Sequence, residues 1–306
     1  MSARLADNVR RREVSGNIWL TKPRLLEEDL VPRTFEYEVL ESEQAVGHAM
    51  FAEIEAAARA KDDDLVIVLL GGRGAQALHL LFGEVALKTE SDWLLKRLKV
   101  FTQDALAPLR MDNGLSFVRD FERLLGRAFF EKIKSFTAMN TASEDLESEL
   151  AGYVSNLDSA GGIDIFFIGL GPEAGGASHL AYIKPGSGAT AADDAGLIPI
   201  SASILEHHIT KFKAGGSSVS EADEKECRAA THIMTLGPGA ILGAKRIVQS
   251  IVDASTAPKK RESFRKLLET EISSDKETRA IQLDENPGLW LRVHPNVRSL
   301  ILPDLL

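Results

Sequence analysis

The stretch IDIFFIGLGPEAGGASHLAYIKPGS, Ile163–Ser187, decides the fold of this chain. Its first part, Ile163–Leu170, is a short and nearly unbroken run of β-branched and aromatic residues, which is typical of a strand buried on both faces of a parallel sheet. The run ends in a glycine-rich turn that leads to His179. Glycines let a backbone approach a ligand closely, and open α/β sheets place ligands at the carboxyl ends of their strands. The stretch therefore predicts a buried strand whose end borders a ligand site.

Further apolar runs alternate with helical patterns on both sides of this stretch. The predicted strands are Thr34–Leu40, Leu65–Leu70, Leu98–Phe101, Thr231–Leu236 and Arg246–Val252, with two more strand-like pieces in the C-terminal LWLRVHPNVRSLILP. The predicted helices are Glu43–Ala60, Gln76–Lys88, Phe117–Phe136, Ala142–Leu157 and Pro258–Thr270, and the small-residue segment Gly186–Ala195 is predicted to be a loop. This alternation predicts a three-layer αβα, Rossmann-like α/β domain with a mainly parallel sheet. We expect the domain to span residues 34–306, after an N-terminal extension of residues 1–33.

Composition narrows the class of protein. The 306 residues are 44% hydrophobic and 26% charged, which suits a globular protein with a sizeable core. The net charge of −9 disfavours broad electrostatic binding to nucleic acid or to an anionic membrane. The single cysteine, Cys227, excludes an intramolecular disulfide and fits a reducing compartment. No apolar run is long enough for a transmembrane helix, so we expect a cytoplasmic protein.

Three predicted strands end in residues that can bind or react. The segment GGRGA follows Leu65–Leu70 at the start of a helix, where backbone amides bind anions and an arginine can fork onto a phosphate; its residues are Gly71, Gly72, Arg73, Gly74 and Ala75. Asp104 follows the next strand and can act as a general base, and His179 can move a proton near neutral pH. Purely structural roles stay open for two of these residues. Asp104 can cap the structure that follows its strand, and Arg73 can be an ordinary surface residue. The pair His207-His208 fits a surface helix better than a metal site, and His294 suits strand packing or a subunit contact.

These segments, in this order, resemble the motifs of the glucosamine-6-phosphate deaminase/6-phosphogluconolactonase family. The family's phosphate loop is matched by Gly71–Ala75, its F-x-x-D-E segment by Phe101–Ala105, and its G-x-G-x-D-G-H-x-A-F-N-E-P-G-S segment by Gly169–Glu173 and His179–Ser187. The C-terminal LRVHPN is similar to the LQ-x-HPN strand of the deaminase branch. The resemblance runs from about Thr34 to the C-terminus.

The resemblance implies a set of site residues. Asp104, His179 and Glu173 are implied to be catalytic. The implied substrate and phosphate ligands are Gly71, Gly72, Arg73, Gly74, Lys184 and Lys260, where Lys260 matches a phosphate-binding lysine by its helix spacing. No metal and no cofactor are implied, because a carboxylate can move a proton between adjacent carbons by itself.

The chain departs from the family pattern inside the predicted site. Glu173 stands for the family's aspartate and is separated from the histidine by the extra residues AGGAS, while Lys184 replaces a glutamate and Ala105 replaces the second acid of D-E. The family's phosphate-binding arginine has no clear match in SASILEHHITKF. Because a nearby cation lowers the pKa of an acid, we expect Lys184 to keep Asp104 ionised and to favour a more anionic substrate.

The implied function is that of a hydrolase or isomerase of carbohydrate metabolism. The resemblance implies aldose–ketose isomerisation with deamination of an amino-sugar phosphate. The alternatives are hydrolysis of a phosphorylated sugar lactone and a non-catalytic sensor that binds a sugar phosphate. The expected partner is a phosphorylated sugar or sugar acid, not nucleic acid or a membrane, and a homo-oligomer stays open.

Overall fold

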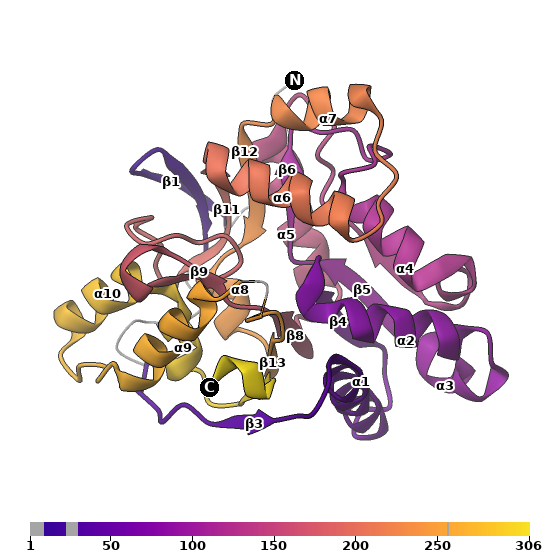
Figure 1. Cartoon of the computed structure of the whole chain (residues 1–306), viewed down its shortest axis with the longest axis horizontal. Helices are drawn as coiled ribbons and strands as arrows, with labels where there is room; N and C mark the ends of the chain where they lie inside the picture. Colours follow the sequence, from indigo (N-terminus) through magenta and orange to yellow (C-terminus); the bar gives the residue numbers. More distant parts are fainter. Residues whose placement is uncertain (1–8, 23–29, 256) are drawn as a thin grey trace.

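A seven-stranded parallel sheet forms the centre of the molecule (Figure 1). The computed structural model describes residues 9–22, 30–255 and 257–306. The sheet order is β3-β14-β13-β8-β4-β5-β7, and every neighbouring pair in it is parallel. These strands are β3 (Tyr37–Val39), β14 (Val297–Ile301), β13 (Arg246–Ile251), β8 (Ile165–Ile168), β4 (Leu65–Leu69), β5 (Leu98–Thr102) and β7 (Ser135–Thr137). The predicted α/β class with a mainly parallel sheet is therefore confirmed.

Strand β8 is buried along its whole length, as its apolar run predicts. Neighbouring side chains of a strand point to opposite faces of the sheet. Phe166 and Phe167 accordingly belong to two different core clusters, and neither has any solvent-exposed surface. The sheet thus carries a hydrophobic layer on each face, which is why this run contains no polar alternation.

Helices surround the two sheets of the molecule (Figure 1). They are α1 (Glu43–Arg59), α2 (Gln76–Ala86), α3 (Asp92–Leu95), α4 (Phe117–Lys132), α5 (Leu146–Ser159), α6 (Ala202–Ala214), α7 (Glu221–Arg228), α8 (Pro238–Leu242), α9 (Lys259–Glu269) and α10 (Lys276–Glu285). Side-chain caps fix several starts, for example Ser42, whose hydroxyl accepts from the backbone N of Ala45 at 3.1 Å. Within the described residues, no helix combines the length and the apolar character needed to cross a membrane.

A second sheet, which the sequence analysis did not predict, is antiparallel. Its order is β1-β2-β11-β12-β6, with β1 (Arg10–Val14), β2 (Asn17–Thr21), β11 (Asp193–Pro199), β12 (His232–Leu236) and β6 (Asp104–Ala107). In Figure 1 it lies toward the top with α6 and α7, away from β3 at the bottom. Strand β11 begins in the predicted Gly186–Ala195 loop. The acidic and small residues at its start are uncommon in strands, so the sequence pattern does not indicate a strand there.

Two predicted elements differ from those in the structure, one in its end and one in its type. The apolar spacing of Phe117–Phe136 predicts one helix, but α4 ends at Lys132 and Phe136 lies in β7. Phe136 still packs against Phe121 and Phe130, with ring centroids 5.7 and 5.1 Å apart, so its apolar position fits either element. The first C-terminal strand-like piece is a 3₁₀ helix, Pro287–Val293, whose proline suits a helix start.

The described part of the predicted extension, residues 9–22 and 30–33, contributes a hairpin to the second sheet. Residues 1–8 and 23–29 lie outside the described residues. Trp19 is fully buried, and its indole N–H donates to the carbonyl of Ser187 at 3.2 Å. The division of the chain at residue 33 stays a prediction.

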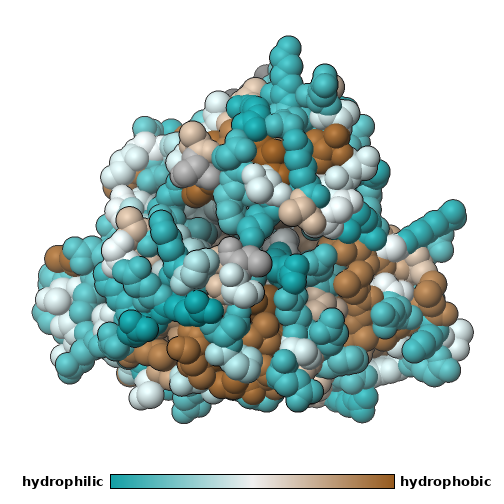
Figure 2. All heavy atoms as spheres, in the orientation of Figure 1, coloured by the Kyte–Doolittle hydropathy of each residue, from teal (hydrophilic) through white to brown (hydrophobic). Residues whose placement is uncertain are grey.

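The molecular surface is mostly hydrophilic on the face that Figure 2 shows, with hydrophobic atoms gathered over the region of α2 and α3. Leu80 on α2 and Trp93 on α3 are among the exposed hydrophobic residues, at 48% and 41%. Such exposure is compatible with a subunit contact, and the homo-oligomer stays a prediction.

Candidate active site

The predicted site residues lie at the carboxyl ends of adjacent strands. Strands β8, β4 and β5 are neighbours, and they lead into the Glu173–His179 segment, the Gly71–Ala75 loop and Asp104. Tyr182 connects two of these ends. Its ring stacks on the His179 imidazole, with centroids 5.7 Å apart and planes 7° from parallel. Burial and the nearby charge of Asp104 both raise the pKa of Tyr182. Tyr182 therefore contacts His179 and lies within electrostatic range of Asp104.

Glu173 and His179 form a hydrogen-bonded pair, with 2.6 Å between Oε1 and Nδ1. This bond, together with the charge of Lys184, holds the pKa of Glu173 below its usual value. An ionised carboxylate only accepts hydrogen bonds, so Nδ1 of a neutral His179 carries the proton. Nε2 is left with its lone pair, as a general base or a proton shuttle requires.

The inserted residues Ala174–Ser178 do not move Glu173 away from the histidine. The insertion closes on itself, because the backbone N of Glu173 donates to the carbonyl of Ala177 at 2.8 Å. It is also anchored to α9, where Ser263 Oγ donates to Ala177 O at 2.7 Å and Lys266 Nζ to Gly175 O at 3.1 Å. The extra residues therefore form a turn that brings its two ends together.

The residues around His179 fix its position. Gly171 pairs with it across a two-stranded sheet, β9 (Gly171–Pro172) with β10 (Ser178–His179). A Cβ added at Gly171 would lie 1.8 Å from Nε2 of His179, so only glycine leaves room for the ring. Asn286 holds the preceding residue, accepting from the backbone N and the hydroxyl of Ser178 at 2.9 and 2.6 Å.

A tight turn places Lys184 beside His179. Leu180 and Ile183 exchange two backbone hydrogen bonds, of 3.1 and 2.8 Å, around Ala181 and Tyr182. Both of these central residues have positive φ, 48° and 59°, as in a type I′ turn. Non-glycine residues rarely adopt such values, and those that do are concentrated at functional sites. The chain thus reverses direction at this turn. His179 precedes and Lys184 follows the bridged pair Leu180–Ile183, so the backbones of these two residues are neighbours.

Asp104 is buried, with 4% of its surface exposed, and Nε2 of Gln103 donates to its carboxylate. Burial raises the pKa of Asp104 to about 7, although the Gln103 hydrogen bond opposes the rise. The expectation that Lys184 keeps Asp104 ionised with a low pKa is therefore wrong. The charge of Lys184 acts on Glu173 instead, and the desolvation of Asp104 dominates its pKa.

The Gly71–Ala75 loop leads into α2 through a short 3₁₀ helix, Arg73–Ala75. No side chain caps the start of α2, so its first N–H groups are left for another acceptor. Arg73 uses its Nε and Nη2 donors elsewhere. Its side chain is 54% exposed and forks onto Glu43, at 2.9 and 2.6 Å.

Lys260 lies at the start of α9 and forms an ion pair with Asp253, whose side chain is 11% exposed. Asp253 follows β13 at the same sheet edge, but no motif in the sequence marks it as a site residue. His207 is exposed on α6, as its interpretation as a surface residue predicts. Partial desolvation lowers the pKa of His207, and the charges of Lys211 and Lys260 lower it further.

Other singled-out residues have structural partners. His208 is buried between Phe117 and Phe212, its Nε2 lies 2.7 Å from the carbonyl of Leu115, and burial lowers its pKa to about 4. Nε2 of His294 lies 2.8 Å from the carbonyl of Ala244, so it serves packing. Cys227 is buried, which raises its pKa to about 11. Across the described ranges, no three His, Cys, Asp or Glu side chains converge as a metal site would require.

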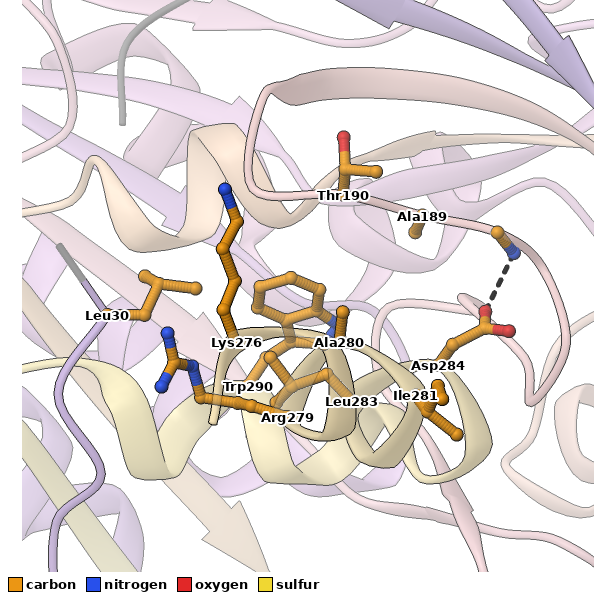
Figure 3. A pocket seen from close by; sticks show the side chains of 11 residues that line it. Leu30, Ala189, Thr190, Lys276, Arg279, Ala280, Ile281, Leu283, Asp284 and Trp290 are labelled. Atoms are coloured by element: carbon orange, nitrogen blue, oxygen red, sulfur yellow. Dashed lines mark hydrogen bonds between the residues drawn. The ribbon is translucent and has the colours of Figure 1, made fainter. Parts of the chain in front are cut away.

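A separate pocket of about 270 Å³ lies between α10 and the Gly188–Thr190 segment (Figure 3). Lys276, Arg279 and Trp290 line it from one side, and Asp284 accepts from the backbone N of Gly188 at 2.7 Å. None of the predicted site residues lines this pocket.

Comparisons with known proteins agree with the motifs. No protein-family model matches the chain. A glucosamine-6-phosphate deaminase of Staphylococcus epidermidis is 23% identical over 239 residues, an alignment covering 76% of this chain and 83% of that enzyme. A solved monomeric glucosamine-6-phosphate deaminase has a TM-score of 0.66 at 20% identity and covers 89% of this chain and 98% of its own. The 6-phosphogluconolactonase of Trypanosoma cruzi has a TM-score of 0.61 at 14% identity, covering 90% and 97%. The predicted resemblance and fold are confirmed.

Proposed function

We propose that this chain, a divergent relative of the glucosamine-6-phosphate deaminases, is an enzyme that acts on a phosphorylated sugar at the carboxyl ends of β4, β5 and β8. The hydrogen bond between Glu173 and His179, beside the buried Asp104, carries the proposal. A positioned imidazole and a carboxyl group with a pKa near neutrality are what proton transfer between adjacent sugar carbons needs.

The proposed reaction is aldose–ketose isomerisation coupled to deamination of an amino-sugar phosphate. His179, oriented by Glu173, assists ring opening by moving the proton of the ring hydroxyl. Asp104 removes the proton next to the carbonyl and returns it to the neighbouring carbon. The amides of the Gly71–Ala75 loop, Arg73 and Lys260 hold the phosphate, which requires Arg73 to exchange Glu43 for the ligand and Lys260 to share Asp253 with it.

Lactone hydrolysis is the second candidate, and one observation favours it. The Glu173–His179 pair is complete, while Lys184 stands where the deaminases have a carboxylate, so water activation by His179 needs no replaced residue. Lys184 and Ala105 also suit a sensor that binds a sugar phosphate without turning it over. We also propose that the protein is located in the cytoplasm, a reducing compartment, as its composition predicts.

Two assays run side by side separate these functions. Ammonia release from glucosamine 6-phosphate, abolished by Asp104→Asn, selects the deaminase. Hydrolysis of 6-phosphogluconolactone that survives Asp104→Asn but not His179→Ala selects the lactonase. Binding of these sugar phosphates without turnover selects the sensor, and absence of binding by a broad panel of hexose 6-phosphates contradicts the proposal.

A further inference from the structure

The three tyrosines of the chain differ in what their hydroxyl groups contact. Tyr37 is 41% exposed, which leaves its side chain open to solvent. Tyr153 is buried, and its hydroxyl donates to the carbonyl of Thr102 at 2.6 Å. Tyr182 is partly buried, and no group in the described ranges forms a hydrogen bond with its hydroxyl. The fold therefore places this hydroxyl beside His179 without using it.

The Tyr182 side chain is held in place, and its hydroxyl can be reached. Its backbone has a φ of 59°, a value that a bulky residue adopts only when the surrounding structure enforces it. Its ring lies 7° from parallel to the imidazole of His179, which the hydrogen bond to Glu173 orients in turn. The hydroxyl is not one of the enclosed polar atoms that lack a partner, so it keeps some accessible surface. A ligand at the site can therefore contact it.

The hydroxyl supplies a kind of group that its two neighbours do not. Burial and the charge of Asp104 raise the pKa of Tyr182, so the phenol stays protonated at neutral pH and can donate a hydrogen bond. Nε2 of a neutral His179 and an ionised Asp104 only accept. Tyr182 thus adds a neutral donor to a site whose other reactive groups are bases.

Both candidate reactions need a donor at the same substrate atom, the oxygen on carbon 1. When Asp104 takes the proton from carbon 2, the electron pair of the C–H bond forms a double bond to carbon 1, and the carbonyl pair moves onto the oxygen. When water activated by His179 attacks a lactone, a C–O bond forms at carbon 1, and the carbonyl pair again moves onto the oxygen. A fixed donor at that oxygen stabilises the charge as it develops.

We infer that the hydroxyl of Tyr182 donates a hydrogen bond to the oxygen on carbon 1 of the substrate and is a catalytic residue. The inference rests on the proposed sugar-phosphate function and holds for either of its two reactions. The hydroxyl keeps its proton throughout. The family motif H-x-A-F-N-E has phenylalanine at this position, so the hydroxyl is a feature of this chain.

Tyr182→Phe tests the inference, because it removes the hydroxyl and keeps an aromatic ring to stack on His179. In whichever of the ammonia-release and lactone assays the wild type is active, we expect kcat and kcat/KM to fall together by about 10²-fold, the cost of removing one such donor. The thermal midpoint should not fall, because the hydroxyl has no partner in the free protein. Tyr37→Phe makes the same chemical change on the exposed β3 and is the matched control, which should keep full activity.

The remaining outcomes contradict the inference in different ways. Unchanged kcat in Tyr182→Phe, or a change confined to KM, overturns it while the sugar-phosphate function stands. A lowered thermal midpoint of Tyr182→Phe would assign the hydroxyl a structural role and overturn it as well. If the folded wild-type protein turns over neither substrate, the proposed function fails and the inference fails with it.

Discussion

Oε1 of Glu173 and Nδ1 of His179 are 2.6 Å apart, although the five residues Ala174–Ser178 separate them in the sequence. The insertion folds into a turn anchored on α9, so a longer segment presents an acid to the histidine. A glutamate has one more methylene group than the aspartate it replaces. The two changes together preserve the pairing that orients the imidazole.

Glu173→Ala should remove that orientation. We expect the activity found in the paired assays to fall by about 10²-fold, because a positioned general acid or base typically contributes that much. Glu144→Ala, which changes an exposed glutamate on another segment, is the control and should leave activity unchanged. Equal activity of both variants in steady-state assays would show that Glu173 does not serve His179.

Gly171→Ala should displace the His179 ring. The added Cβ would meet Nε2 at 1.8 Å, and neither strand β9 nor β10 can accommodate it without moving the imidazole. We predict at least a tenfold loss of activity with the fold retained, the loss expected when a proton-transfer group is misplaced. Gly152→Ala on α5, where an added Cβ meets nothing within 4 Å, should keep full activity and gain about 0.5–1 kcal/mol of stability. An active Gly171→Ala enzyme would contradict the described position of His179.

The raised pKa of Asp104 makes a prediction about stability. Below pH 3.8 the carboxyl is protonated in the folded and unfolded chains alike, so its ionisation contributes nothing. Between that pH and about 7 the unfolded chain releases the proton first, so the free energy of unfolding decreases as the pH rises. Above about 7 the penalty is complete, up to about 4 kcal/mol at roughly 1.4 kcal/mol per pKa unit.

Asp104→Asn removes this titration. Urea unfolding at pH 4 and pH 8 should show that the variant loses less stability between these two pH values than the wild type does. Turnover by the wild type should rise as the pH passes through about 7, because only the ionised Asp104 acts as a base. A variant that loses as much stability as the wild type would contradict the assignment.

The N-terminal hairpin is tied to the segment after Lys184 by Arg12. Its guanidinium pairs with Asp193, which has no exposed surface, and donates to the carbonyl of Gly188 at 2.8 Å. Arg12→Met should cost about 2–3 kcal/mol, somewhat less than a fully buried pair, because Thr21 and Thr190 still donate to Asp193. Arg11→Met on the same strand breaks only exposed pairs and should cost less than about 1 kcal/mol. Denaturant unfolding that ranks the two variants equally would contradict this role for the hairpin.

The sequence predicts the parts of the structure that depend on local pattern. The sequence predicts strands β8 and β4, because a strand buried on both faces is a continuous apolar run without polar alternation. The glycines that follow these strands are equally recognisable in the sequence. The antiparallel sheet could not be predicted, because β11 starts with two aspartates. The charge of one of them, Asp193, is balanced by Arg12, which is distant in the sequence. The pKa of Asp104 could not be predicted either, because it depends on burial produced by elements far apart in the chain. The pairing of Arg73 with Glu43 joins a loop to the start of α1 and leaves no signal in the spacing of either segment.

The crystal structure of the complex with 6-phosphogluconate is the most direct test of the site. The account predicts that the phosphate lies on the backbone amides of the Gly71–Ala75 loop and on Lys260, with the carboxylate end beside His179 and Lys184. A ligand bound elsewhere, for example in the pocket between α10 and Gly188–Thr190, with the strand ends left empty, would contradict it.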